Sequence, residues 1–446
     1  MTAWTSAQVA AALGVPAPAE QAFTAISTDT RALRPGALFV ALKGERFDAH
    51  TLLDAARAAG ATAAVVRRGT PHVDALPFFE VDDTLVALGR LARNRRGQLP
   101  QGAHVVAVTG SSGKTGTKEM IRAALATRWS THATAENFNN LVGVPLTILS
   151  APDQAQALVV EAGASEPGEI ARLREIIHPT IAVITNVGHA HVEGFGSLEG
   201  VMAEKLSLLD GVPLAVVGTE PAALAGLARA RTRTVVAGAA PPAEVRPDAC
   251  RLDDEGRARL EWRGHTVTLP VPGLHQAENA MIALAVAEAA GAEPGPAVRA
   301  LGEIRLPPGR GTVHRLGGLT VIDDTYNANP GSLRRAVELG AWVAQASDRP
   351  LAVVVGSMLE LGPESGKLHA ALAEEIVARR PALVGAVGEF VEAFEPHRRA
   401  LGNRLITAGD ADALGPKLRA ALSGNEVVLV KASRGVALER VLRHLL

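Results

Sequence analysis

The sequence has little cysteine, few aromatic side chains and almost no net charge. Cys250 is the only cysteine among 446 residues, so no intrachain disulfide can form and a reducing compartment is expected. Aromatic residues make up 3% of the chain, too few to stack a run of nucleic-acid bases. The formal net charge of −1 provides no overall field that would gather nucleic acid or anionic lipid. An anionic ligand therefore needs a local site.

Long apolar segments are missing as well. The sequence has no stretch of about 18 uncharged apolar residues, and its start, Met1-Thr2-Ala3-Trp4, lacks the basic region and apolar run of a signal peptide. We therefore expect a cytoplasmic protein that binds neither a membrane nor nucleic acid. Hydrophobic residues still form 47% of the chain, so it can bury large cores built mainly from Ala, Val and Leu.

The sequence does contain short β-branched runs that alternate with Ala-, Leu- and Arg-rich stretches of helical period. This alternation is typical of an α/β protein with a mostly parallel sheet. Strands are expected at Leu38–Leu42, Ala61–Val66, Val105–Val108, Leu158–Val160, Ile181–Thr185, Leu214–Val217, Val267–Leu269, Thr320–Ile322, Leu351–Val355, Ala382–Val387, Leu405–Thr407 and Val427–Lys431. Helices are expected at Ala7–Leu13, Leu52–Ala59, Lys118–Arg128 and Asn279–Ala290.

These elements fall into three blocks along the chain. At roughly 100–200 residues per domain the length allows two to four domains, and the blocks predict domains at 1–100, 101–310 and 311–446. The segment Arg305–Arg310 contains Pro-Pro, which cannot continue a helix or a central strand, so we expect a linker there. The Ala- and Pro-rich segment Val236–Ala243 is expected to be a loop.

A glycine-rich loop follows the strand expected at Val105–Val108. It reads Gly110-Ser111-Ser112-Gly113-Lys114-Thr115 and runs into an expected helix. In such a loop the backbone N–H groups converge on phosphate oxygens, Lys114 can reach the β- and γ-phosphates, and Thr115 can offer a hydroxyl to Mg²⁺. The longer form of this motif has Gly where Val108 stands. An ordinary glycine turn is the alternative, but the strand–loop–helix context favours nucleotide binding.

Polar side chains end two of the other expected strands. Glu161 follows Leu158–Val160, and His189 and His191 follow Ile181–Thr185. A carboxylate suits a hard cation, and imidazole is tolerated by Mg²⁺ or Mn²⁺. A single Glu or His at a strand end is usually capped or solvated. Three such groups at the carboxyl ends of strands, where α/β sheets bind ligands, favour a metal site.

In order and spacing, these residues resemble the ATP-dependent Mur ligases over essentially the whole chain. The matching stretches are Ser27–Arg31 and Pro35–Gly44, the phosphate loop, Asn137–Pro145, Glu161, Thr185–His191, Glu204-Lys205, His275 to Asn279, Gly309-Arg310, Asp323–Pro330, Gly356–Gly362 and Val430–Gly435. The stretch Asp323–Pro330 resembles the branch that adds D-alanyl-D-alanine, whereas the branch that adds diaminopimelate or lysine typically has Tyr-Ala-His-x-Pro there. Ala49, Ser357 and Ala432 depart from the usual Gly, Asp and Gly.

The resemblance implies a three-domain α/β fold: an N-terminal UDP-binding domain, a central P-loop domain with a parallel sheet that binds ATP, and a Rossmann-like C-terminal domain. The implied reaction joins D-alanyl-D-alanine to UDP-N-acetylmuramoyl-tripeptide through an acyl phosphate, with ADP and phosphate as by-products, in peptidoglycan precursor synthesis. ATP and Mg²⁺ (or Mn²⁺) are the implied cofactors. A monomer is expected.

The resemblance also assigns roles to individual residues. The expected catalytic residues are Lys114, Glu161, His191 and Lys205, with one Mg²⁺ on Thr115 and Glu161 and a second on His191 and a carbamylated Lys205. ATP contacts are expected from Gly110, Ser111, Ser112, Gly113, Lys114, Thr115, Asn279 (to adenine), Arg310 and Asp324. Substrate contacts are expected from Ser27, Thr28, Arg31, Asn137, Asn140, Asn327 and Asn329, the last two for the dipeptide. Turn chemistry would also explain Asn327-Ala328-Asn329-Pro330, and Lys205 could be a plain surface lysine.

Other functions remain open at this point. Another ligase of the same superfamily, such as folylpolyglutamate synthetase or the enzyme that adds the third stem residue, would share most of these motifs. A GTP-driven switch is disfavoured because the sequence has no Asn-Lys-x-Asp motif. A non-catalytic nucleotide-binding module would not need Glu161, His191 and Lys205 together.

Overall fold

The computed structural model describes residues 4–44 and 47–446. Met1, Thr2 and Ala3, which entered the signal-peptide argument, lie outside the described residues. Contacts within the chain divide it into two compact units. Unit 1 comprises Met1–Val108, Arg128–Ala164 and Gly168–Ala182, and unit 2 comprises Thr109–Thr127, Ser165–Pro167 and Val183–Leu446.

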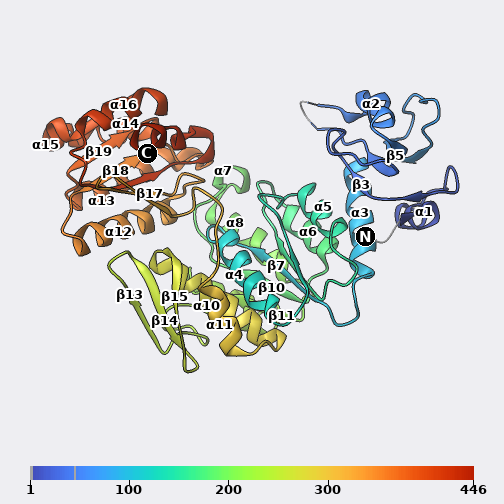
Figure 1. Ribbon diagram of the computed structural model, residues 1–446, viewed down its shortest axis with the longest axis horizontal. Coiled ribbons are helices and arrows are strands. Elements are labelled where there is room, and N and C mark those ends of the chain that lie inside the picture. Colours follow the sequence, from blue (N-terminus) through green and yellow to red (C-terminus); the bar gives the residue numbers. More distant parts are fainter. Residues whose placement is uncertain (1–3, 45–46) are drawn as a thin grey trace. The chain divides into compact units, whose positions relative to one another are not determined.

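The N-terminal part of unit 1 contains a four-stranded, fully parallel sheet in the order β3-β4-β5-β6, coloured blue in Figure 1. Its strands are β3 (Ile26–Ser27), β4 (Ala37–Val40), β5 (Ala61–Arg67) and β6 (Phe78–Val81). A two-stranded pair joins β1 (Trp4–Thr5) to β2 (Ala22–Phe23), and the helices are α1 (Ser6–Leu13), the 3₁₀ turn Ala49–Leu52, α2 (Leu53–Ala58) and α3 (Thr84–Gly97). Continuous burial of β4 explains why its apolar run was visible in the sequence.

The second block contains a six-stranded sheet in the order β12-β11-β10-β7-β9-β8. The strands are β7 (His104–Thr109), β8 (Thr131–Ala133), β9 (Ala157–Glu161), β10 (Ile181–Ile184), β11 (Leu214–Val217) and β12 (Thr234–Val236). The helices are α4 (Lys114–Ala126), α5 (Gly143–Leu149), α6 (Glu169–Ile177), α7 (Val192–Phe195), α8 (Leu198–Leu206), α9 (Ala223–Arg229), α10 (Leu274–Ala290) and α11 (Pro294–Leu301). The helix expected at Lys118–Arg128 begins earlier, at Lys114, directly after the glycine of the phosphate loop.

Unit 2 also contains a three-stranded antiparallel sheet of β13 (Ala249–Leu252), β14 (Arg257–Trp262) and β15 (His265–Pro272). The sequence analysis found only Val267–Leu269 of it. In β14 every second residue is buried, so charged and apolar side chains alternate, as expected for a strand with one solvated face. The segment expected as a loop, Val236–Ala243, starts on the last residue of β12 and is otherwise irregular, with Ala237 in an isolated bridge.

The C-terminal part of unit 2 contains a six-stranded sheet in the order β16-β17-β21-β18-β19-β20, orange to red in Figure 1. The strands are β16 (Thr312–Leu316), β17 (Leu319–Asp323), β18 (Leu351–Val355), β19 (Leu383–Ala386), β20 (Leu405–Thr407) and β21 (Val427–Lys431), and the larger helices are α12 (Pro330–Ala346), α13 (Ser365–Ala378) and α16 (Ala411–Ala421). In this sheet β16 pairs with β17 in antiparallel, and the pairs β17–β21, β21–β18, β18–β19 and β19–β20 are parallel. Alternate residues of β18 enter two hydrophobic clusters, so both faces of the sheet are covered.

These observations confirm the α/β class and the mostly parallel sheets. The expected linker Arg305–Arg310 lies outside every helix and strand. Among the described residues, no helix is both long enough and apolar enough to span a bilayer.

Candidate functional site

The glycine-rich loop that was expected to hold phosphate leads into α4 in unit 2. The helix begins directly after Gly113, whose φ is +79° and which, as glycine, has no side chain to cap the N terminus. A Cβ atom at Gly110, where φ is +148°, would overlap Oγ1 of Thr185, and one at Gly113 would lie 2.6 Å from Oδ1 of Asn279. Both positions therefore require glycine, on steric and on conformational grounds.

Side chains that follow β10 hold this loop in shape. Asn186 accepts a hydrogen bond from the backbone N–H of Ser112 at 3.1 Å and donates one to its carbonyl at 3.2 Å. The hydroxyl of Thr185 donates to the same carbonyl at 2.6 Å. Ser111 Oγ donates to the carbonyl of Gly188 and accepts its N–H, both at 2.9 Å. The resemblance had singled out this segment, and the structure shows what it does for the loop.

Three expected ATP-site residues lie on or against the phosphate loop. Nζ of Lys114 donates to the carbonyl of Gly110 at 2.8 Å, so its charge lies across the loop. Thr115 is buried at the first turn of α4, where the helix dipole favours an anion. Asn279 is buried on α10 and adjoins Gly113. Its assignment to adenine stays a prediction.

Lys205 and His191 also belong to unit 2. Lys205, on α8, is 2% exposed, and burial together with the nearby charge of Lys114 lowers its pKa to about 7. His191 precedes α7 with a φ of +56° and pairs through Nδ1 with Glu360. This contact lowers the pKa of the Glu360 carboxyl. Lys205 is thus a buried amine near the phosphate loop and not the surface lysine that was the alternative.

Glu161 lies in unit 1 at the end of β9 and is 2% exposed. Its Oε1 accepts a hydrogen bond from Nδ2 of Asn139 at 2.9 Å, and its backbone N–H donates to Oγ1 of Thr134 at 2.9 Å. Asn139 fixes the carboxylate but was not among the predicted site residues. Asn140 instead accepts the N–H groups of Val142 and Gly143 at the start of α5, and Asn137 is exposed.

The expected UDP-site residues lie in the N-terminal part of unit 1. Ser27 Oγ accepts the backbone N–H of Asp29 at 3.2 Å and lines a cavity of about 170 Å³ together with Arg34 and Arg95. Arg31 is exposed, and its side chain forms two hydrogen bonds with the Asp29 carboxylate, at 2.8 and 3.0 Å. Together with a third from the backbone N–H of Arg31, at 2.9 Å, they lower the pKa of that carboxyl to about 2. Thr28 is half-buried beside them.

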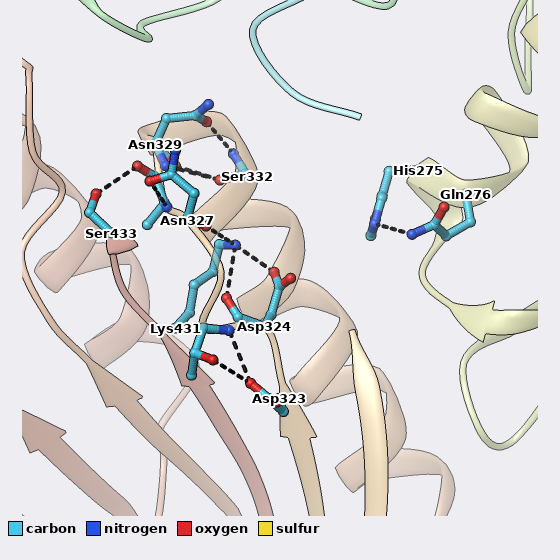
Figure 2. A network of polar contacts seen from close by, with 11 residues as sticks. His275, Gln276, Asp323, Asp324, Asn327, Asn329, Ser332, Lys431 and Ser433 are labelled. Atoms are coloured by element: carbon cyan, nitrogen blue, oxygen red, sulfur yellow. Dashed lines mark hydrogen bonds and ion pairs between the residues drawn. The ribbon is translucent and has the colours of Figure 1, made fainter. Parts of the chain in front are cut away.

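A polar network organises the loop after β17 (Figure 2). Lys431, at the end of β21, is 2% exposed, and its Nζ lies 2.5 Å from Oδ2 of Asp324 and 2.9 Å from the carbonyl oxygen of Asn327. Burial raises the pKa of the Asp324 carboxyl, while the charge of Lys431 opposes this shift. Lys431 stands in a stretch that the resemblance covered, but the sequence analysis gave it no role.

The two asparagines expected at the dipeptide site differ. Asn329 caps α12, because its Oδ1 accepts the N–H of Ser332 at 2.8 Å, while its Nδ2 donates to the carbonyl of Ser111 in the phosphate loop at 3.3 Å. The turn chemistry that was the alternative thus accounts for the side-chain oxygen of Asn329. Asn327 is exposed, and its Oδ1 accepts the N–H of Ala328 at 2.9 Å.

Arg310 completes the set of predicted ATP contacts. Its guanidinium carbon lies 3.7 Å from the ring centroid of Tyr326. Its Nε is buried and has no hydrogen-bond partner in the described part of the chain. A buried donor without an acceptor costs free energy, which a ligand oxygen would recover.

The three departures from the family pattern have structural consequences. Ser357 accepts the N–H of Glu389, at the start of the short helix Glu389–Ala393, at 2.9 Å. Ala432 packs in one of the two C-terminal hydrophobic clusters, and Ala49 packs in the N-terminal one. The two alanines are thus accommodated in hydrophobic cores, and Ser357 is accommodated by a hydrogen bond.

The residues do not form a ready-made metal cage. Within residues 4–44 and 47–446, no group of three or more His, Cys, Asp or Glu side chains is placed to hold a metal ion. A cation here would therefore draw on hydroxyl, phosphate or modified-lysine oxygens as well.

Three family models match successive parts of the chain. The model described as Mur ligase family, catalytic domain, matches residues 22–96, the Mur ligase middle domain matches 108–287, and the Mur ligase, glutamate ligase domain, matches 309–434. The expected organisation in three domains is thus confirmed. The bounds 1–100, 101–310 and 311–446 stay predictions.

Individual relatives align along almost the whole length. The chain is 36% identical over 439 residues to the UDP-N-acetylmuramoyl-tripeptide--D-alanyl-D-alanine ligase of Escherichia coli (strain K12), with 94% of this chain and 93% of the relative covered. MurF from Acinetobacter baumannii superposes with a TM-score of 0.89 at 29% identity, covering 100% and 99%. MurF ligase from Thermotoga maritima, solved in complex with ADP, gives 0.82 at 31%, covering 94% and 96%. The chain therefore belongs to the Mur ligase family.

Proposed function

We propose that the protein is an ATP-dependent ligase that joins D-alanyl-D-alanine to UDP-N-acetylmuramoyl-tripeptide and releases ADP and phosphate, in peptidoglycan precursor synthesis. The observation that carries the proposal is the phosphate loop. Its two glycines are required by the side chains packed against them, and Lys114 lies across it. This loop belongs to a chain that is similar, almost end to end, to ligases of that name.

The reaction explains why the site needs cations and dipoles. Joining a carboxylate to an amine in water is uphill, so ATP first converts the carboxylate into an acyl phosphate, which the amine attacks through a tetrahedral intermediate. Both steps bring anions together, and catalysis consists mainly of positioning and charge neutralisation. Lys114 and the N terminus of α4 supply part of that neutralisation for the phosphates of ATP.

A Mg²⁺ ion suits the donor set expected for it. The Thr115 hydroxyl and the Glu161 carboxylate are hard oxygen donors, and the hydrogen bond from Asn139 orients the carboxylate. We assign Thr115 and Glu161 to this cation, which when bound neutralises the β- and γ-phosphates.

A second cation suits His191 and Lys205 only if Lys205 is carbamylated. A free amine is a poor partner for Mg²⁺, whereas a carbamate supplies anionic oxygens. Carbamylation needs a neutral amine, and Lys205 is buried near Lys114, a setting that disfavours its cation. We expect Lys205→Ala to be nearly inactive at equal fold content by circular dichroism. The intact-protein mass under bicarbonate should be about 44 Da above the sequence mass, and full activity of the variant would rule the carbamate out.

The remaining assignments cover the substrates. We assign Arg310 and Asp324 to ATP and Asn327 and Asn329 to the dipeptide. Ser27, Thr28, Arg31, Asn137 and Asn140 are assigned to the UDP-linked substrate. The hydrogen bond from Asn329 to Ser111 brings the expected dipeptide loop to the phosphate loop within unit 2, which fits a site that closes around both substrates and excludes water.

The test is a ligase assay with ATP, Mg²⁺, UDP-N-acetylmuramoyl-tripeptide and D-alanyl-D-alanine, followed by phosphate release and product mass. We expect phosphate release to depend on both the tripeptide and the dipeptide, and the product to carry the dipeptide. Addition of a single amino acid to a shorter precursor would instead identify the enzyme that adds the third residue. ATP hydrolysis without any acceptor would contradict a ligase.

A further inference from the structure

The only tyrosine of the sequence, Tyr326, lies in the loop after β17, and the guanidinium groups of two arginines lie near its ring. The guanidinium carbon of Arg310 is 3.7 Å from the centre of its ring, and that of Arg434 is 5.7 Å away. At the shorter distance a planar guanidinium is attracted to the ring through cation–π and stacking interactions. The ring of Tyr326 therefore sets the position of the Arg310 guanidinium.

The backbone makes a second connection between the same two segments. The N–H of Tyr326 donates to the carbonyl of Gly309, the residue before Arg310, at 2.9 Å. A Cβ atom at Gly309, where φ is +74°, would lie 3.1 Å from this backbone nitrogen. Glycine at this position thus permits the close approach of the linker to the loop, and Arg310 is fixed at its backbone and at its side chain.

What Arg310 lacks is an acceptor for its buried Nε donor. No described residue accepts a hydrogen bond from this atom, although the guanidinium has five donors. Arg310 is also close enough to Asp324 to lower the pKa of that carboxyl, so it stands beside the ion pair of Asp324 with Lys431 shown in Figure 2. The group is held in place by the protein while one of its donors is left for a ligand.

We propose that Tyr326 is a positioning residue for nucleotide binding: its ring face holds the Arg310 guanidinium in the orientation in which it meets the phosphates of ATP. This inference rests on the proposed function, which supplies ATP as the ligand. Tyr326 acts through Arg310, so its ring and not its hydroxyl is required. The stack also ties the linker to the loop that carries Asp324.

The direct test measures the Kd of a non-hydrolysable ATP analogue with Mg²⁺ by calorimetry. Tyr326→Leu should weaken binding about fivefold, the factor that corresponds to a cation–π contact of about 1 kcal/mol, while Tyr326→Phe should stay within about twofold of the parent. In an Arg310→Ala background, Tyr326→Leu should have no further effect. Equal losses in both backgrounds would show a merely structural role and overturn the proposal, as would an unchanged Kd for Tyr326→Leu.

A spectroscopic readout is available because the chain has a single tyrosine. Protein labelled with 3-fluorotyrosine has one ¹⁹F tyrosine resonance, which should shift when the analogue binds and should shift much less in the Arg310→Ala variant. A resonance that does not respond to the nucleotide would contradict the proposal. If the parent protein itself binds no analogue, the proposed function fails; if it binds normally and only the Tyr326 variants are unaffected, this inference alone fails.

Discussion

Two loops of unit 2 connect a strand to a helix in the same way, but different interactions stabilise their conformations. The phosphate loop and the loop Asp324–Asn329 each leave a buried strand and enter a long helix, α4 or α12. The conformation of the phosphate loop depends on glycine, because Gly110 and Gly113 have no side chain and Thr185 and Asn279 pack directly against their backbone. The conformation of the loop Asp324–Asn329 depends on a buried side chain, because Lys431 contacts both the Asp324 carboxylate and the carbonyl of Asn327.

This difference decides how far each loop can be recognised in a sequence. The glycines of the phosphate loop are adjacent to the lysine and threonine that they serve, so the whole signal falls within six residues. Lys431 is far along the chain from Asp324 and meets it only because β21 pairs with β17 in parallel. The phosphate loop can therefore be recognised from a short stretch of sequence. The loop Asp324–Asn329 cannot, because its stabilising lysine comes from another strand of the sheet.

The largest expected effect is in the phosphate loop. Lys114→Ala removes the charge that lies across the loop, and turnover should fall by about a thousandfold or more, in the range of losses for a removed electrostatic stabiliser. Circular dichroism and thermal midpoint should stay close to those of the parent. Lys417 is exposed, and Lys417→Ala serves as a control that should have normal turnover. Near-normal activity of Lys114→Ala would contradict the assignment of this loop to phosphate binding.

The second prediction tests the steric argument for that loop. Gly110→Ala should lower ligase activity by at least about tenfold, because its Cβ would overlap Thr185 and its φ is strained for an L residue. Gly102→Ala is the matched control, since Gly102 also has a positive φ but has no atom within 4 Å of the added Cβ. Gly110→Ala with the same activity as Gly102→Ala would contradict the requirement for glycine at position 110.

The third prediction concerns the loop Asp324–Asn329 and its contact with Lys431. Lys431→Met leaves the Asp324 carboxylate partly buried without its partner, and we expect a loss of stability of about 2 kcal/mol, less than for a fully buried pair because water reaches Asp324. The double variant Lys431→Met/Asp324→Asn should recover much of the thermal midpoint but not the affinity for ATP. A single variant as stable as the parent would contradict the role given to Lys431.

The last prediction concerns an effect that is absent near neutral pH and grows only as the pH falls. His275 on α10 (Figure 2) has its pKa lowered to about 3 by burial and by the charges of Arg335 and Lys431, against about 6.5 in an unfolded chain. Between these values the unfolded chain binds the extra proton, so stability falls as the pH falls, by up to about 1.4 kcal/mol per pH unit. His275→Gln should flatten the dependence of the thermal midpoint on pH between 6.5 and 4. An unchanged slope would contradict this account.

The predictable part of the fold follows from burial. Strands buried on both faces, such as Leu351–Val355, appear as continuous apolar runs and were located to the residue. The half-exposed strand β14 alternates charged and apolar residues and was missed. The helix after the phosphate loop was expected too late because its first turn, from Lys114, is polar.

The site divides in the same way. Residues within one motif, such as Lys114 and Thr115, could be assigned roles from the sequence because chemistry and context are adjacent there, and those roles stay predictions. Asn139, Tyr326 and Lys431 were not given roles, since their parts depend on what a neighbouring segment or strand brings to them. The resemblance covered all three positions, but it did not say what each side chain contacts. The contacts in the structure are what show that each of these residues orients another one.

The central claim is that this chain activates a carboxylate with ATP as an acyl phosphate and passes it to a dipeptide. The most direct measurement uses UDP-N-acetylmuramoyl-tripeptide with ¹⁸O in its terminal carboxylate and analyses the released phosphate by mass. The account predicts one ¹⁸O atom in each phosphate and a product extended by D-alanyl-D-alanine. Unlabelled phosphate, or label found in AMP, would contradict it.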